Sequence, residues 1–90
     1  MKLYETITAE NWAKYFPMQD NSGCVYSHLL AMDLRSGTDR RILNDLAEIV
    51  RLLFPERVYA RDSLMVVGDF NDHPDTTVED VIRVCKVADV

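Results

Sequence analysis

The sequence contains few residues that break or cross-link a chain, with three prolines, three glycines and two cysteines among 90 residues. It also lacks any apolar run of the roughly 18 to 20 residues that would span a bilayer. The N-terminal residues have no apolar segment of the kind found in signal peptides. These absences predict a cytoplasmic protein with no membrane partner. Cys24 and Cys85 are then expected to be free thiols, because that compartment is reducing.

Basic residues are scarce in the last third of the chain. Residues 62–90 carry two basic and seven acidic side chains, whereas residues 35–61 carry six and four, within a net charge of −5. No Lys or Arg occurs from Asp62 to Ile82. This 62–82 face is not expected to contact duplex DNA, because neutralising phosphates requires clustered cations. An acidic face suits a basic protein partner, a cation, or solubility alone.

Composition and periodicity predict a mainly α, compact single domain of four to five helices over residues 1–90. The expected helices cover residues 8–16, 24–34, 38–54 and 76–88. Thr8 and Thr38 are good N-caps for the first and third helices, and Thr76 or Thr77 begins the last one, with Thr76 opening a capping box. The second helix has apolar residues around nearly its whole circumference, which indicates a buried central helix.

Residues 57–70 allow two interpretations. Strand-favouring residues on both sides of Arg61, Asp62 and Ser63 could form a small hairpin, for which residues 1–5 would supply a third strand. The fold would then be α+β. Alternatively, Asp62 or Ser63 caps a short helix whose apolar residues share one side. The local pattern alone favours the hairpin.

Three segments form a recognisable set of motifs. They are Thr8-Ala9-Glu10-Asn11-Trp12 as a helix start, Cys24-Val25-Tyr26-Ser27-His28-Leu29-Leu30 as a Cys-led helix, and Phe70-Asn71-Asp72-His73-Pro74-Asp75-Thr76-Thr77 as a turn that opens the final helix. In this order they resemble a bacterial and phage family of small domains of unknown function. The resemblance implies a largely helical fold, which favours the helical interpretation of residues 62–71. It implies no activity.

Possible metal ligands occur at regular spacing in this turn. Positions 1, 3, 5, 7, 9 and 12 of a calcium loop are matched by Asp69, Asn71, His73, Asp75, Thr77 and Asp80. Pro74 stands where the loop needs glycine, and Asp80 stands where it needs a bidentate Glu. A zinc set would consist of Cys24, His28, His73 and Cys85, but its second pair lacks the compact spacing of structural zinc sites. We therefore expect no metal and no cofactor.

A small thiol-dependent or metal-dependent enzyme would be centred on Cys24 and His73, with Asp72 as the third catalytic residue. A helix N-terminus stabilises a thiolate, a histidine can act as its base, and an aspartate can orient the histidine. The alternative is that Cys24 is a small packing residue. Asn71 and Asp72 are expected to bond the backbone of their own turn, with Pro74 fixing its path.

The predicted function is therefore a non-enzymatic protein-binding module that acts through an acidic surface. The candidate binding residues are Asp69, Asp72, His73, Asp75, Glu79 and Asp80. The expected partner is a protein of basic character, and a homo-oligomer is an alternative. The resemblance to a phage family suggests an inhibitor of a host or defence protein.

Overall fold

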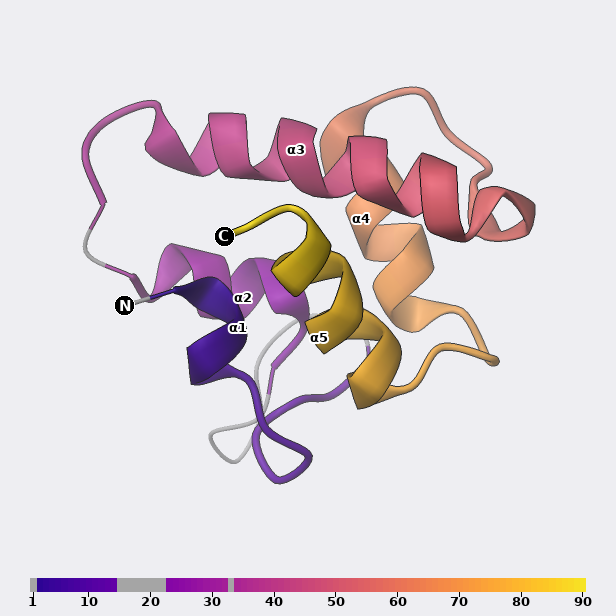
Figure 1. The fold of residues 1–90 in the computed structure, drawn as a ribbon, viewed down its shortest axis with the longest axis horizontal. Coiled ribbons are helices and arrows are strands. Elements are labelled where there is room, and N and C mark those ends of the chain that lie inside the picture. Colours follow the sequence, from indigo (N-terminus) through magenta and orange to yellow (C-terminus); the bar gives the residue numbers. More distant parts are fainter. Residues whose placement is uncertain (1, 15–22, 33) are drawn as a thin grey trace.

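Residues 2–14, 23–32 and 34–90 are described by the computed structural model, and they form five α-helices and one 3-10 helix. The elements are α1 (Leu3–Thr6), α2 (Val25–Leu30), α3 (Thr38–Leu53), η1 (Pro55–Arg57), α4 (Ser63–Asp72) and α5 (Val78–Val87). The mainly α prediction is confirmed, since these described residues contain no strand and only an isolated bridge between Trp12 and Gly23. α3 runs along one side of the molecule, where α4 and α5 pack against it (Figure 1). α2 contacts α4, and α1 contacts both α2 and α5.

α3 is the longest helix, and its apolar residues recur at helical spacing. Ile42, Leu46 and Val50 are buried and lie four residues apart, so they form one continuous face toward the core. The N-cap of α3 is Gly37, whose φ of +86° is readily adopted by glycine. Thr38 is therefore the first helical residue and not the cap that the sequence predicted.

Residues 63–72 form α4, so the hairpin interpretation of residues 57–70 is wrong. The Asp62 carboxylate accepts a hydrogen bond from the Leu64 N–H at 2.9 Å, which satisfies a free donor of the first turn. The apolar residues of this segment share one helical face, on which Val66, Val67 and Phe70 are each at most 1% exposed. Burial of this face against the neighbouring helices overrides the local strand preference of valine.

The N-terminal segment differs from both predictions made for it. Residues 3–6 form α1 instead of a strand. The described part of the expected 8–16 helix contains only a turn at residues 8–11. There the Thr8 N–H donates to Asn11 Oδ1 at 2.8 Å, and the Asn11 N–H donates to Thr8 Oγ1 at 3.3 Å. Such local side-chain bonds compete with helical bonding. The remainder of the predicted helix lies outside the described residues.

α2 is shorter than the predicted 24–34 helix and is not buried on all sides. It ends at Leu30, after which the Met32 N–H bonds to the Leu29 carbonyl at 3.2 Å in a tighter turn. His28 is buried, whereas Leu30 is 51% exposed. One side of this apolar helix is therefore left uncovered by the described residues.

α5 begins with a capping box, but its residues differ from the predicted pair. Thr77 is the N-cap, and its Oγ1 accepts a hydrogen bond from the Asp80 N–H at 3.2 Å. In return, Asp80 Oδ2 accepts a hydrogen bond from the Thr77 N–H at 3.2 Å. The box is thus one residue later than the predicted one, which would have started at Thr76.

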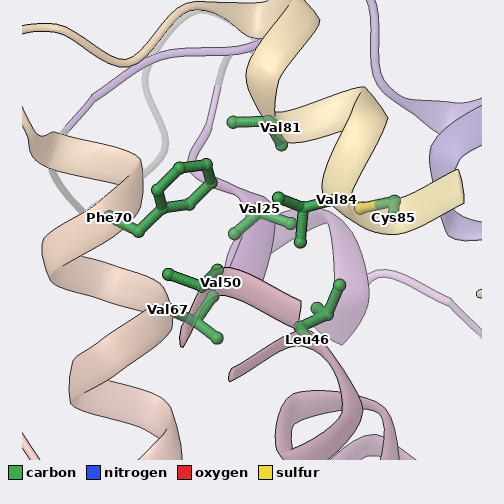
Figure 2. Close-up of a pocket in the computed structure, with 8 residues that line it drawn as sticks. All are labelled: Val25, Leu46, Val50, Val67, Phe70, Val81, Val84 and Cys85. Atoms are coloured by element: carbon green, nitrogen blue, oxygen red, sulfur yellow. The ribbon is translucent and has the colours of Figure 1, made fainter. Parts of the chain in front are cut away.

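The core lies where α2, α3, α4 and α5 meet. Figure 2 shows side chains from these four helices that line a cavity of about 10 Å³. They are Val25, Leu46, Val50, Val67, Phe70, Val81, Val84 and Cys85. The Cα radius of gyration is 11.7 Å, close to the roughly 12 Å expected of a compact domain of this length. The two ends of the chain meet, since Lys2 Nζ lies 3.1 Å from Asp89 Oδ1.

Candidate functional site

The turn that carries the candidate residues is held by Asn71, which is fully buried. Its Oδ1 accepts hydrogen bonds from the Trp12 Nε1–H at 2.7 Å and from the Val25 N–H at 3.0 Å. Its Nδ2 donates to the Ala13 carbonyl at 3.2 Å and to Asp72 Oδ1 at 3.0 Å. Asn71 therefore joins the end of α4 to the N-terminal segment and to the start of α2. Asn71 was predicted to bond the backbone of its own turn, and this prediction is wrong, because its backbone partners belong to Ala13 and Val25.

Lys14 makes a second link between the N-terminal segment and the turn. Its Nζ donates to the carbonyl oxygens of His73 at 2.5 Å and of Pro74 at 3.1 Å. These carbonyls follow the C-terminal end of α4, where the helix dipole favours a cation. The positive charge of Lys14 thus lies beside residues 62–82, which themselves contain no Lys or Arg.

His73 is the C-cap of α4, and both of its ring nitrogens have hydrogen-bond partners. Nδ1 accepts from the Asp75 N–H at 3.1 Å, so the neutral ring carries its proton on Nε2, which donates to the Tyr59 hydroxyl at 3.1 Å. The two rings are stacked, with centroids 6.2 Å apart and planes inclined by 11°. Tyr59 is 69% exposed, so the pair presents aromatic surface to solvent beside the turn.

Asp80 has structural partners on two sides. Its Oδ2 completes the capping box of α5 and also lies 3.1 Å from Arg57 Nη1. The same Nη1 donates to Oγ1 of the buried Thr76 at 3.1 Å, and the guanidinium carbon lies 4.6 Å from the centroid of the Phe54 ring. Asp80 therefore ties α5 to η1, and its carboxylate serves the fold.

The remaining predicted acidic residues follow one another along α4, the turn and α5. Asp69 and Asp72 lie in the last turn of α4 and are half-buried, whereas Asp75 in the turn and Glu79 in the first turn of α5 are exposed. We call these four residues the acidic surface. Glu79 is favoured by the dipole of α5, but Asp69 and Asp72 lie at the end of α4 where the dipole disfavours negative charge.

Cys24 has different partners from those that a thiol enzyme requires. It is 7% exposed, and its Sγ lies 3.5 Å from Oγ of Ser27. Both nitrogens of His73 are already bonded, and His28 Nε2 lies 2.9 Å from the Asn11 carbonyl oxygen. A catalytic cysteine needs a free basic nitrogen within hydrogen-bond reach. Among the described residues, the Cys24 thiol is bonded to Ser27, and neither histidine is hydrogen-bonded to it.

The residues of the calcium-loop pattern do not form one loop. Asp69 and Asn71 belong to α4, whereas Thr77 and Asp80 begin α5. In the part of the chain that the structure describes, no group of three or more His, Cys, Asp or Glu side chains is placed to hold a metal ion.

Cys85 is a packing residue of the core. Its side chain lines the cavity of Figure 2 and has no exposed surface. Burial raises the pKa of the Cys85 thiol from 9.0 to about 12, because the thiolate loses its hydration. The thiol therefore stays protonated near neutral pH and is a poor nucleophile.

Four side chains that contact the turn were not identified from the sequence, namely Trp12, Lys14, Arg57 and Tyr59. Trp12 carried a usable signal, because a packed indole usually finds an acceptor for its N–H group. The buried asparagine 59 positions later supplies that acceptor. Lys14 and Arg57 carried no comparable signal, since each is an ordinary basic residue outside the acidic stretch.

Comparison with known proteins identifies no relative of this chain. No protein family matches the chain, and neither curated proteins nor solved structures provide a match. The resemblance to a phage family stays a prediction. No helix among the described residues is long and apolar enough to cross a membrane.

Proposed function

We propose that the chain is a small, non-enzymatic protein-binding module whose acidic surface binds a basic segment of a partner protein in the cytoplasm. The observation that carries this proposal is the position of Asp69 in the last turn of α4. A carboxylate near a helix C-terminus opposes the dipole and contributes less to stability than a neutral residue would. Its presence there favours a role outside the fold.

The surroundings of the acidic surface suit an Arg or Lys side chain. The stacked rings of the exposed Tyr59 and the half-buried His73 lie beside it and offer a face for a cation–π contact. The two neighbouring cations are directed elsewhere than at Asp69, Asp75 and Glu79, because Lys14 bonds backbone carbonyls and Arg57 pairs with Asp80 and Glu56. Carboxylates next to an aromatic face can form charge-assisted hydrogen bonds with a basic partner.

The test compares two double variants that remove equal charge. Asp69→Asn with Glu79→Gln changes the acidic surface, whereas Asp45→Asn with Glu48→Gln changes α3 and serves as the control. Each tagged protein is incubated with lysate of its native host, and the captured proteins are quantified by mass spectrometry. We expect basic proteins to be captured by the wild type and the control, and to be lost at least about tenfold with the acidic-surface variant. Equal capture by both variants would contradict the proposal.

A more specific form of this proposal is a phage-encoded inhibitor of a host or defence protein. It is supported only by the sequence resemblance of the Glu10-Asn11-Trp12, Cys24-led and Asn71-Asp72 motifs. A captured partner with a known defence or host enzymatic activity would allow a direct test, since adding the purified chain should then inhibit that activity. If the activity of the partner were unchanged at a saturating concentration of the chain, inhibition of that partner would be excluded.

A further inference from the structure

The imidazole ring of His73 is bonded on both sides at the turn between α4 and α5. Its Nδ1 accepts a hydrogen bond from the Asp75 N–H at 3.1 Å, and its Nε2 donates to the Tyr59 hydroxyl at 3.1 Å. The Tyr59 ring is stacked on it, with planes inclined by 11°. This one ring therefore joins the turn to the segment between η1 and α4, 14 positions earlier in the chain.

The hydrogen bond at Nδ1 exists only while the ring is neutral. A backbone N–H is a donor and cannot accept, so the nitrogen that faces it must carry a lone pair. An imidazolium carries a proton on both nitrogens. Protonation of His73 would therefore set two donors against each other at Asp75. The bond at Nε2 differs, because the Tyr59 hydroxyl can accept from either form of the ring.

The elements around the ring carry charges of both signs. Lys14 of the N-terminal segment donates to the carbonyl oxygen of His73 itself, so a cation already lies at this turn. Arg57 of η1 is paired with Asp80 of α5. The other carboxylates are those of Asp72 in the last turn of α4, Asp75 in the turn, and Glu79 in the first turn of α5. A protonated ring is repelled by Lys14 and attracted by these carboxylates.

We propose that His73 is a pH-sensitive switch for the turn between α4 and α5. The neutral ring holds the Asp75 N–H and the Tyr59 hydroxyl together. Uptake of one proton from water at Nδ1 breaks the bond to Asp75 and releases the ring toward the neighbouring carboxylates. Histidine is the side chain that ordinarily changes its charge between pH 5 and 8. The turn therefore has a closed arrangement at higher pH and an open arrangement at lower pH.

The switch also regulates partner binding, and this consequence rests on the proposed function of the acidic surface. An imidazolium beside Asp75 adds one positive charge to that surface. A basic partner is then attracted less strongly. The acidic surface is accordingly expected to bind its partner more weakly at low pH.

Nuclear magnetic resonance of the full chain tests the switch without any partner. The chain contains two histidines, and the second one, His28, has its Nε2 at 2.9 Å from the Asn11 carbonyl oxygen. At pH 8 we expect the His73 proton on Nε2 and nuclear Overhauser contacts between the His73 and Tyr59 rings. At pH 5 we expect a proton on both nitrogens of His73, loss of these ring contacts, and an upfield shift of the Asp75 amide proton.

The matched variant is His73→Asn, because its Oδ1 can accept a hydrogen bond from the Asp75 N–H but carries no titrating nitrogen. We expect the Asp75 amide and Tyr59 ring signals of this variant to stay unchanged between pH 8 and pH 5. His28→Gln removes the other imidazole and should keep the pH-dependent change of the wild type. Circular dichroism shows whether each variant is folded. If His28→Gln does not fold, the separately assigned His28 signals of the wild type serve as the control.

Four results would overturn the switch. The His73 proton lies on Nδ1 at pH 8, or the ring stays neutral at pH 5, or the contacts between the rings persist after protonation, or His73→Asn changes as the wild type does.

Capture of basic proteins at pH 7.5 and pH 5.5 tests the regulation of binding separately. We expect capture by the wild type to fall at the lower pH and capture by His73→Asn to fall less. An equal fall in both would show that His73 does not regulate binding. If nothing is captured at either pH while the resonance changes occur, the acidic-surface proposal fails and the switch stands.

Discussion

Asn71 is the side chain on which the packing around the turn depends most directly. Replacing it with alanine would leave the Trp12 Nε1–H and the Val25 N–H without their acceptor. A buried donor without a partner costs about 1–3 kcal/mol. We therefore expect Asn71→Ala to lower the free energy of unfolding by roughly 2–5 kcal/mol, measured by urea denaturation.

Asn44→Ala provides the matched control for this prediction. Asn44 lies on the exposed side of α3, where alanine has the higher helix propensity. We expect a change in unfolding free energy of less than about 0.5 kcal/mol. If both variants were equally stable, the hydrogen bonds of Asn71 would not stabilise the fold.

The raised pKa of the Cys85 thiol leads to a prediction about its chemical reactivity. Its pKa of about 12 lies three units above 9.0, so the thiolate population of the folded protein is about a thousandfold lower than that of a free thiol at the same pH. Iodoacetamide at pH 8 should label Cys85 only slowly, and peptide mapping would measure the rate. Labelling in urea should restore the rate of a free thiol, whereas fast labelling of the folded protein would show that Cys85 is accessible.

The same pKa shift has a consequence for stability. The folded-state pKa of Cys85 is raised, so its contribution to stability is fully present below pH 9.0 and is lost as the pH rises through about 12. Stability measured between these values should fall less in Cys85→Ala than in the wild type. The variant itself starts from a lower stability, because it enlarges the cavity of Figure 2.

The start of α5 and the start of α3 can be compared by equivalent substitutions. Thr77 is the N-cap of α5, so Thr77→Ala should lower the free energy of unfolding by about 1 kcal/mol, visible as a lower melting temperature. Thr38 is the first helical residue of α3, behind Gly37 as the cap. Thr38→Ala should therefore leave the melting temperature unchanged or slightly higher. A larger loss at Thr38 than at Thr77 would mean that the caps are assigned to the wrong residues.

The whole molecule should unfold in one cooperative transition. Trp12 lies in the N-terminal segment but is hydrogen-bonded to α4, and the Tyr4 N–H bonds to the Val90 carbonyl at 3.4 Å. Tryptophan fluorescence therefore reports the docking of that segment, and far-ultraviolet circular dichroism reports the helices. We expect the two melting curves to coincide. An earlier fluorescence transition would show that the N-terminal segment detaches on its own.

The elements with strong local signals were predicted well, and those with competing signals were not. α3 has helical periodicity over its whole length, so its bounds were predicted within one residue at each end. The segment of α4 contains adjacent valines that favour strand locally, so its local pattern was misleading. A helix over residues 62–71 was predicted only from the family resemblance, and in the structure this helix packs against α3. The turn at residues 8–11 has a good helix start, but the Asn11 side chain binds the backbone instead.

The candidate site was predicted in part for a similar reason. The acidic residues could be named from the sequence, because charge is a local property of a residue. Their partners could not, since Arg57 and Lys14 reach the turn from distant positions in the chain. Likewise, Asn71 was predicted to bond the backbone of its own turn, and only the position of Trp12 and Val25 makes it a buried junction.

Local sequence was thus sufficient for the helical class, the long α3 helix and the uneven distribution of charge, because each follows from neighbouring residues. The tertiary structure decided that Asp80 serves the fold, through its ion pair with Arg57. It also decided that α2 ends at Leu30 and that, among the described residues, this leucine is left exposed. These properties depend on contacts between residues far apart in the chain, and hydrophobic burial and hydrogen bonding select those contacts only when the whole chain is packed.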